Sequence, residues 1–238
     1  MNKSKIELVF FDLNDTLVKE SSWYKLNLAM GMTPEENAKF YKLYQSGKIT
    51  YKQWIEAALK IYRERGNLKR EEIERVVANS YKYFEHARRL VAYSKEKYLT
   101  AIGSCSMGLL AERISRELGI EHHRSLTDFF FTKNGFIDQI KVNDHTGNDA
   151  QNKVHFLREI CTELGVKLEN CACIGDGRND LELFRATGNG IAFERSSDQA
   201  KSLARWVATN IDSPSSFAFM ANLMLCWRKK NNKKTYVN

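Results

Sequence analysis

The chain has no hydrophobic run long enough to cross a bilayer, since none of its apolar stretches reaches the roughly 18 residues that a membrane-spanning helix needs. It also lacks a signal-peptide cleavage site, because its first residues, MNKSKIELVFFDL, lead directly into a strand-like run. These absences predict a cytoplasmic protein without a membrane partner. No low-complexity segment or internal repeat interrupts the 238 residues, so we expect one large domain or a core with a modest second domain.

A disulfide framework is absent as well. The five cysteines are an odd number at unrelated spacings, which favours a reducing compartment. Cys171 and Cys173 form a C-x-C pair, but alternation along a strand puts both on one face and no second ligand pair lies nearby, so we interpret them as core residues. The five histidines show no H-x-x-x-H-like spacing, and we interpret them, including His122 and His123, as surface or loop residues.

The net charge of +8 is concentrated at the C-terminal end. Five positive charges fall within residues 228–238, and nothing acidic follows Asp212, so the rest of the chain is nearly neutral. We interpret this segment as a solvated tail. Contact with nucleic acid or an anionic membrane is the alternative, and we consider nucleic acid an unlikely partner. The preceding FAFMANLMLCW is too short to span a membrane but fits a final helix.

Strand-like apolar runs alternate with helix-length stretches along most of the chain. The runs are IELVFFDL, YLTAIGS, CACIGDG, GIAF and WVAT, and the helical stretches between the later ones include residues 109–118, 154–164 and 180–186. Each run is mostly apolar throughout, as expected when helices cover both faces of a sheet. The pattern predicts an α/β fold with a doubly wound, Rossmann-like parallel sheet.

One interval breaks this alternation. From about Glu20 to Lys97 there is no convincing strand, and periodic segments predict helices over residues 23–30, 34–45, 51–65 and 70–81, with a return helix at about 86–97. We therefore predict a small all-helical cap inserted after the first strand. The expected boundaries are 1–18 and 86–212 for the core, 19–85 for the cap, and 213–238 for a C-terminal helix and basic tail. Asn134-Gly135, between two apolar runs, predicts a β-hairpin.

Polar residues gather where the predicted strands end, and in doubly wound sheets ligands bind beyond those ends. Carboxylates there suit a hard cation such as Mg2+, a lysine and a hydroxyl suit phosphate oxygens, and a free aspartate can act as a nucleophile. We therefore expect phosphoryl-transfer chemistry in one crevice. The residues are Asp12 after the first strand, Ser104 at the end of the second, Asp176, Asn179 and Asp180 after CACIG, and Lys153 at a helix start.

In these motifs the sequence resembles the haloacid dehalogenase superfamily of phosphatases, and most closely its phosphoserine phosphatase-like branch. DLNDTL, AIGS, Lys153 and GDGRND occur in the family's order, and the resemblance extends to about Thr209. It implies a Mg2+-dependent phosphomonoester hydrolase that acts on a small phosphorylated metabolite through an aspartyl-phosphate. The resemblance implies that Asp12 is the nucleophile. It also implies that Mg2+ is bound by Asp12, Asp176 and the main-chain carbonyl of Asn14, with support from Asp180. The implied substrate contacts are Ser104, Lys153 and Asn179.

Asn14 departs from the family's pattern, which has a second aspartate two residues after the nucleophile. That aspartate protonates the leaving oxygen and then activates the water that hydrolyses the phosphoenzyme. An amide cannot transfer a proton usefully, and loss of a general acid–base group typically forfeits about 10²–10⁴ in rate. We expect acyl, aryl and anhydride phosphates to suffer least, alkyl phosphates to suffer most, and the phosphoenzyme to accumulate. Replacement of this group by the adjacent Asp15 is the less favoured alternative.

Three further positions depart from the branch. Ala58 stands where a cap arginine is usual, Ser21 aligns with a glutamate, and Cys105 replaces a glycine at a place where backbone closely approaches phosphate. The alternative function is therefore a catalytically weak or inactive descendant that binds a phosphorylated metabolite or partner. We predict further substrate contacts from Ser21, Tyr51 and Cys105, with Trp23 and Trp54 as candidates to line the cap side.

Overall fold

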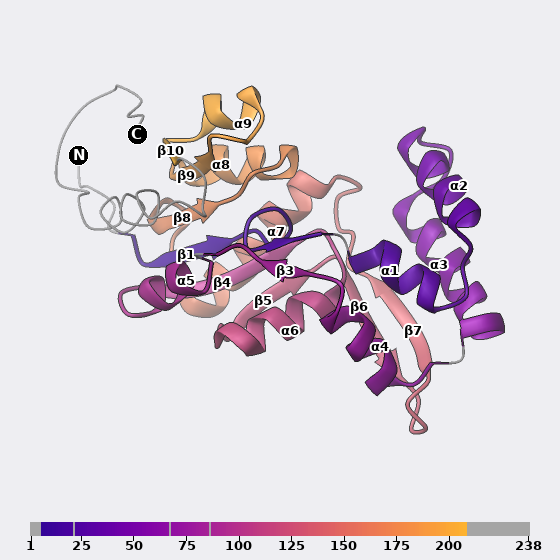
Figure 1. Ribbon diagram of the computed structural model, residues 1–238. Coiled ribbons are helices and arrows are strands. Elements are labelled where there is room, and N and C mark those ends of the chain that lie inside the picture. The colour runs from indigo at the N-terminus through magenta and orange to yellow at the C-terminus, as the bar shows by residue number, and fades with distance from the viewer. Residues whose placement is uncertain (1–5, 21, 67, 86, 209–238) are drawn as a thin grey trace.

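The computed structural model describes residues 6–20, 22–66, 68–85 and 87–208, apart from the side chain of Ser22 (Figure 1). The predicted C-terminal helix, the basic tail and Ser21 lie outside this description. No helix in these ranges is both long and apolar enough to cross a bilayer.

A six-stranded parallel sheet forms the centre of the described chain, in the order β10-β9-β8-β1-β4-β5. From β1 the chain passes to β4 and β5 on one side and then to β8, β9 and β10 on the other. This reversal beside β1 is the topological position at which doubly wound sheets bind ligands. The strands are β1 (Leu8–Phe11), β4 (Leu99–Ser104), β5 (His122–Ser125), β8 (Cys171–Ile174), β9 (Gly190–Phe193) and β10 (Trp206–Ala208).

Side-chain alternation along β1 divides the core into two layers. Val9 and Phe11 belong to one buried cluster and Leu8 and Phe10 to the other, and none of the four is exposed to solvent. Helices cover both layers, as the apolar strand runs predicted. The first layer is covered by α5 (Ala87–Lys95) and α6 (Gly108–Leu118), and the second by α7 (Asp149–Leu164), α8 (Leu181–Thr187) and α9 (Asp198–Leu203).

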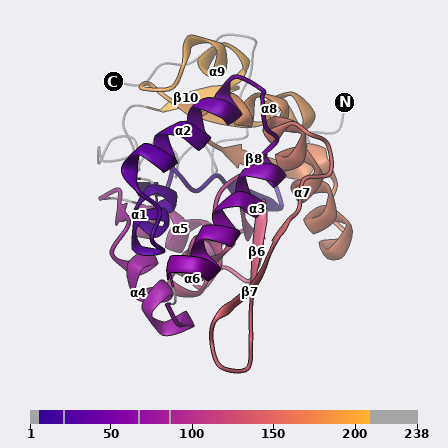
Figure 2. The same ribbon diagram turned by 90° about the vertical axis from the view of Figure 1, so that its right-hand side faces the viewer.

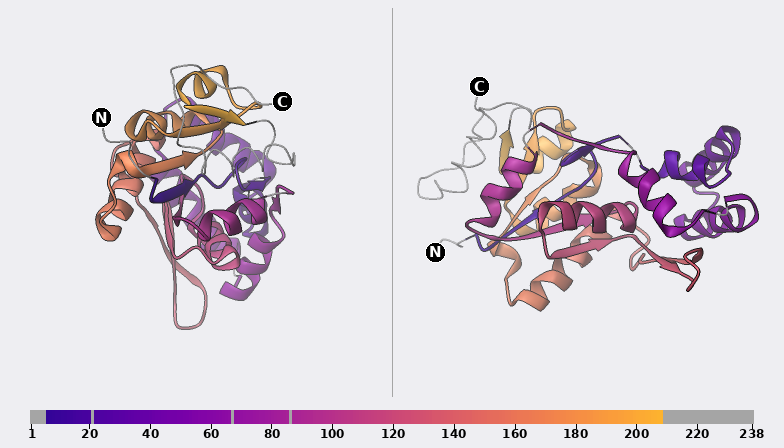
Figure 3. Two further views of the ribbon diagram at one scale, coloured as in Figure 1. Left: turned by 90° about the vertical axis from the view of Figure 1, so that its left-hand side faces the viewer. Right: turned by 60° about the horizontal axis from the view of Figure 1, so that its bottom comes forward.

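The inserted helices lie beyond the carboxyl end of β1, as the indigo and purple ribbons of Figures 1 and 3 show. Thr33 and Thr50 begin α2 (Pro34–Gln45) and α3 (Tyr51–Ile61) with capping boxes, which explains why these two starts agree with the prediction. Beyond α3 the chain continues as a π-helical turn, Tyr62–Gly66. The insert comprises α1 (Ser22–Ala29), α2 (Pro34–Gln45), α3 (Tyr51–Ile61) and α4 (Arg70–Ala78).

Two short strands at the base of the insert were not predicted from the sequence. β2 (Val18–Lys19) pairs with β3 (Lys82–Tyr83) in an antiparallel ribbon that joins the outgoing and returning connections. Each strand is only two residues long, which is too short for a recognisable alternation. The expectation that no strand lies between Glu20 and Lys97 was therefore wrong at Lys82–Tyr83.

The predicted β-hairpin is confirmed. β6 (Thr127–Phe131) pairs with β7 (Ile137–Val142), and Gly135 in the turn has a φ of 85°, which glycine adopts without strain. The hairpin reaches the insert, because the carbonyl of Gly135 accepts a hydrogen bond from the Arg70 amide at the start of α4 (Figure 2). It therefore buttresses the helices from the core side.

The edge strand β5 was also missed. Its sequence, His-His-Arg-Ser, has no apolar run, yet it pairs with β4 from Ala101 to Ser104. His122 and His123, interpreted as surface or loop residues, are thus half-buried residues of a strand. Cys171 and Cys173 lie in the core cluster on one face of β8, as predicted.

Candidate active site

Asp12 directly follows β1 at the reversal in strand order. Its amide donates to the carbonyl of Ile174 at 2.9 Å, which continues the pairing of β1 with β8, and only 5% of the residue is exposed. The chain then turns sharply. Asp15 has a φ of 57°, a left-handed conformation that aspartate tolerates, and its amide donates to the carbonyl of Val18. The turn holds Asp12 at the end of the sheet.

The buried ammonium of Lys153 joins two of the predicted carboxylates. Its Nζ lies 2.6 Å from Asp12 Oδ1 and 2.7 Å from Asp180 Oδ1, and the lysine has no exposed surface. Burial alone would lower the pKa of Lys153, but the charges of Asp12 and Asp180 raise it above its ordinary value. The lysine is therefore held in its charged form between the two carboxylates.

Glycines make room for Asp180 beneath the loop after β8. A Cβ placed on Gly175 would lie 2.3 Å from Asp180 Cγ, so a side chain at that position would displace the carboxylate. Asp180 Oδ2 also accepts from the Gly177 amide at 2.9 Å. Asn179 is half-buried in the same turn, with its Oδ1 close to Gly177. The spacing of GDGRND is thus explained by close packing around Asp180.

Asp12, Asp176 and Asp180 form a three-carboxylate cluster with one oxygen of each within 4.8 Å of the others. Thr16 Oγ1 lies 3.1 Å from Asp12 Oδ2 and 3.2 Å from Asp176 Oδ1, but a hydroxyl has one proton and can donate to only one of them at a time. Burial, opposed by Lys153 and reinforced by the other carboxylates, raises the pKa of Asp12 to about 7. Burial and Asp180 raise the pKa of Asp176 to about 6.

These residues fit a hard divalent cation. The donors are carboxylate oxygens, which Mg2+ prefers, and three negative charges share one lysine. A cation among them would favour the ionised forms of Asp12 and Asp176, because positive charge stabilises a neighbouring carboxylate. The cluster therefore has both the ligand type and the charge that a magnesium site requires.

Two polar atoms near the strand ends are buried without a hydrogen-bond partner among the described residues. They are Ser104 Oγ at the end of β4 and Asn14 Oδ1 after β1. A buried polar group left unpaired typically costs about 1–3 kcal/mol, so each is a ready partner for a bound ligand. Both were predicted as site residues. Cys105, beside Ser104, points its Sγ at the carbonyl of Asp149, 3.2 Å away, and burial raises its pKa.

Tyr51, the first residue of α3, packs against both buried core clusters and so joins the insert to the core. Its hydroxyl is buried and unpartnered in the described structure, and burial together with the charge of Asp149 raises its pKa well above the ordinary value. Its ring packs edge-on against Trp54, with centroids 6.3 Å apart. Trp23 instead packs against Phe129 of the hairpin, at 5.9 Å.

Two positions stand apart from this arrangement. Ala58, where the branch has an arginine, is buried among apolar residues of the insert and adds no charge. Asp15 is exposed, and its carbonyl accepts from Arg195.

Thr16 and Asp149 were missed as site residues. The only signal for Thr16 was its place inside DLNDTL, and Asp149 had none beyond its position four residues before Lys153.

Comparison with known proteins identifies the class to which this architecture belongs. A family model described as haloacid dehalogenase-like hydrolase matches residues 1–219, and the chain belongs to this family, as its motifs predicted. Its relatives include proteins named phosphoserine phosphatase. The one from Archaeoglobus fulgidus is 27% identical over 94% of this chain and 61% of its own length. The one from Methanocaldococcus jannaschii is 24% identical over 81% of this chain and 87% of its own length.

Solved structures agree on the fold. A substrate-bound phosphoserine phosphatase complex has a TM-score of 0.67 at 20% identity, covering 90% of this chain and 98% of that one. A phospho-aspartyl intermediate analogue of phosphoserine phosphatase has a TM-score of 0.64 at 22% identity, covering 88% of this chain and 94% of that one. The predicted Rossmann-like core with an inserted cap is thus confirmed, and the relatives support the predicted phosphatase class.

Proposed function

We propose that this protein is a Mg2+-dependent hydrolase of small phosphomonoesters that acts through an aspartyl-phosphate on Asp12. The observation that carries the proposal is the buried Asp12 carboxylate, which contacts Lys153 at 2.6 Å and lies in a cluster with Asp176 and Asp180. A carboxylate buried with a lysine and a cation-type cluster is suited to attack a charged phosphoryl group.

The proposed binding roles rest on the positions of the side-chain donors and, for the Asn14 carbonyl, on the resemblance to the family. Lys153 and Ser104 Oγ would hold the phosphoryl oxygens, since one supplies positive charge and the other an unpartnered hydroxyl. Asp12, Asp176 and the main-chain carbonyl of Asn14 would hold Mg2+, with Asp180 in support through its bond to Lys153. When bound, the cation supplies charge neutralisation at the phosphoryl group.

In the first step an oxygen of Asp12 forms a bond to phosphorus as the ester P–O bond breaks, and the leaving oxygen needs a proton unless it is already a stable anion. In the second step water attacks phosphorus as the bond between phosphorus and the Asp12 oxygen breaks, which frees the carboxylate and releases phosphate, and the attacking water must lose a proton. Asn14 can hydrogen-bond in either step but can transfer no proton, which costs about 10²–10⁴ in rate. Asp15 is exposed whereas Asn14 Oδ1 is buried, so we propose that Asp15 does not replace the missing acid.

The proposed substrate is a small phosphorylated metabolite with a good leaving group, such as an acyl or aryl phosphate. The names of the relatives suggest phosphoserine, but two features disfavour an alkyl ester of an amino acid. Asn14 removes the proton that an alkoxide requires, and Ala58 leaves the buried side of α3 without the positive charge that would bind a carboxylate. Tyr51 is then the proposed cap contact, through its unpartnered hydroxyl.

A second candidate function is phosphate binding without significant turnover. Asn14 favours it because both proton transfers are impaired, and Cys105 favours it because its side chain fills the place beside Ser104. Under this alternative the carboxylate cluster and Lys153 serve only to bind a phosphorylated ligand.

Time-resolved hydrolysis of an aryl phosphate separates these functions. The unaltered protein, Asn14→Asp and Asp12→Asn should be compared with and without Mg2+. We expect a first-turnover burst and slow steady state for the unaltered protein, steady-state turnover faster by about 10²–10⁴ for Asn14→Asp, and neither phase for Asp12→Asn. If the unaltered protein and Asn14→Asp both bind Mg2+ and remain inert, the enzyme proposal is wrong and the binding function takes its place.

A further inference from the structure

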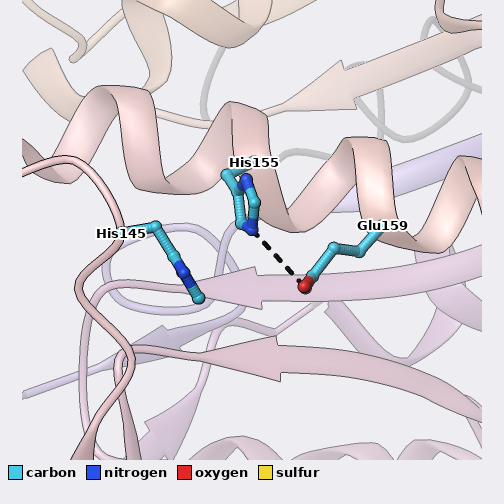
Figure 4. A group of neighbouring side chains, drawn as sticks. All are labelled: His145, His155 and Glu159. Atoms are coloured by element: carbon cyan, nitrogen blue, oxygen red, sulfur yellow. Dashed lines mark ion pairs between the residues drawn. The ribbon is translucent and has the colours of Figure 1, made fainter.

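A second group of possible metal ligands lies outside the carboxylate cluster. His145 comes from the loop between β7 and α7, and His155 and Glu159 project from α7 (Figure 4). One ligand atom from each lies within 4.8 Å of the other two. His155 follows Lys153 by two positions, which is about 200° around the helix, so it faces away from Asp12. The group is therefore separate from the candidate active site.

The spacing of this group suits a tetrahedral cation better than a hydrogen bond. His155 Nε2 and Glu159 Oε1 are 3.4 Å apart, beyond the usual range of about 2.7–3.2 Å for a hydrogen bond. Two ligands at about 2.0–2.1 Å from a tetrahedral zinc lie about 3.3 Å from each other. His145 stacks against His155 with ring centroids 4.2 Å apart, and one of its ring nitrogens lies within 4.8 Å of the ligand atoms of His155 and Glu159.

The backbone of His145 is fixed by a buried amide. Asn152, which has no exposed surface, accepts from the His145 amide at 2.9 Å through Oδ1 and donates to Asp144 Oδ1 at 2.8 Å through Nδ2. Asp144 Oδ1 also accepts from the Gly147 amide at 2.7 Å. The loop therefore presents His145 over α7 without depending on the contact between the two imidazoles.

The Glu159 carboxylate is oriented by a hydrogen bond to the oxygen that does not face His155. Glu159 Oε2 accepts from Arg124 Nε of β5 at 3.2 Å, which leaves Oε1 directed at His155. Ligating carboxylates in metal sites are commonly held by such an outer hydrogen bond. The His145 backbone and the Glu159 carboxylate are thus held by contacts that a cation would not disturb, and His155 is carried by α7.

We propose that His145, His155 and Glu159 bind a divalent transition metal of the zinc type, with water completing the coordination. Two imidazoles and one carboxylate are the donors that Zn2+ accepts, whereas Mg2+ prefers oxygen donors alone. The bound ion joins the loop of residues 143–148 to α7, the helix that carries Lys153. This site does not depend on the proposed phosphatase activity.

Calorimetric titration of the tag-free full chain with ZnCl2 in excess Mg2+ tests the site. The variants are His145→Ala and His155→Ala, with His122→Ala in β5 as a matched histidine outside the group and Asp176→Asn to report binding at the carboxylates. We expect the unaltered protein to bind a Zn2+ ion that Mg2+ does not displace. Each of the first two variants should lose at least about tenfold in affinity, and the two controls should lose none.

Electron paramagnetic resonance with Cu2+ gives an independent readout, because imidazole nitrogens couple to the bound ion. The coupling from two nitrogens should diminish in His145→Ala and in His155→Ala. The proposal is overturned if the unaltered protein binds no Zn2+, if both variants bind it as the unaltered protein does, or if only Asp176→Asn weakens it. It is also overturned if His155→Ala weakens binding and His145→Ala does not, since the helix pair would then suffice.

Discussion

Replacement of Lys153 by methionine removes the ammonium group that contacts the buried carboxylates of Asp12 and Asp180. Methionine is similar in length, so the change leaves the packing of α7 largely intact. At 2.6 Å and an effective dielectric of 20, one lysine–carboxylate attraction is about 6 kcal/mol before desolvation is counted. Desolvation offsets most of this, and removing one partner of a buried pair typically costs 3–5 kcal/mol. Lys153 serves two carboxylates, so we expect a loss of about 3–5 kcal/mol.

Urea denaturation at neutral pH in EDTA measures this loss. Lys52→Met is the matched control, because Lys52 is exposed and meets Glu56 at 4.0 Å within one helix, an interaction worth about 0.3–0.5 kcal/mol. Asp180→Asn added to Lys153→Met should restore part of the stability, since one unpaired carboxylate is gone. Mg2+ should stabilise Lys153→Met more than the unaltered protein. A loss no larger than that of Lys52→Met would refute the reasoning.

Three further predictions concern the same crevice. Asp176→Asn should raise the thermal midpoint in EDTA, because it removes the repulsion between Asp176 and the neighbouring carboxylates, and it should abolish the further rise caused by Mg2+. The control Asp138→Asn, at an exposed position, should change neither value. A Mg2+ response that persists in Asp176→Asn would contradict the assignment of Asp176 as a ligand. The pKa values of about 7 for Asp12 and about 6 for Asp176 mean that at pH 6 Asp12 is mostly protonated and Asp176 is half protonated, and that both are largely ionised by pH 8. Calorimetry in buffers of different ionisation enthalpy should therefore show Mg2+ binding releasing roughly one to one and a half protons at pH 6 and almost none at pH 8. Equal release at both values would contradict these shifts. Cys105→Gly should lower the inhibition constant of inorganic phosphate, because it exposes the backbone beside Ser104. The free energy of unfolding in urea should fall by about 1 kcal/mol. An unchanged inhibition constant would show that the Cys105 Sγ does not limit phosphate access.

The sheet was predictable where its strands are buried on both faces. Leu8–Phe11, Cys171–Ile174 and Gly190–Phe193 are apolar throughout because helices cover both sides, and their polar neighbours mark the strand ends. β5 could not be predicted in the same way. Its His-His-Arg-Ser sequence lies at the sheet edge, and its pairing with β4 is imposed by tertiary contacts.

The residues of the candidate active site were predictable because parallel strands end at one edge of the sheet. Asp12, Ser104 and Asp176 could be read from strand ends, whereas Lys153 came from the order of the motifs. The contact of Lys153 with Asp180 could not be read, because it depends on the packing of α7 against the loop after β8. Neither could the group of His145, His155 and Glu159. Its only sequence signal was the spacing of four between His155 and Glu159, and the bonds of Asn152 that place His145 are tertiary.

The central claim is that Asp12 becomes phosphorylated. The most direct test is to react this protein with an aryl or acyl phosphate in the presence of Mg2+, quench the reaction with acid, and locate the phosphate by peptide mass spectrometry. Because Asn14 slows hydrolysis, we predict a phosphorylated peptide that contains Asp12, a label that chases slowly, and a shorter-lived label in Asn14→Asp. Phosphate on another residue, or turnover that persists in Asp12→Asn, would contradict the mechanism.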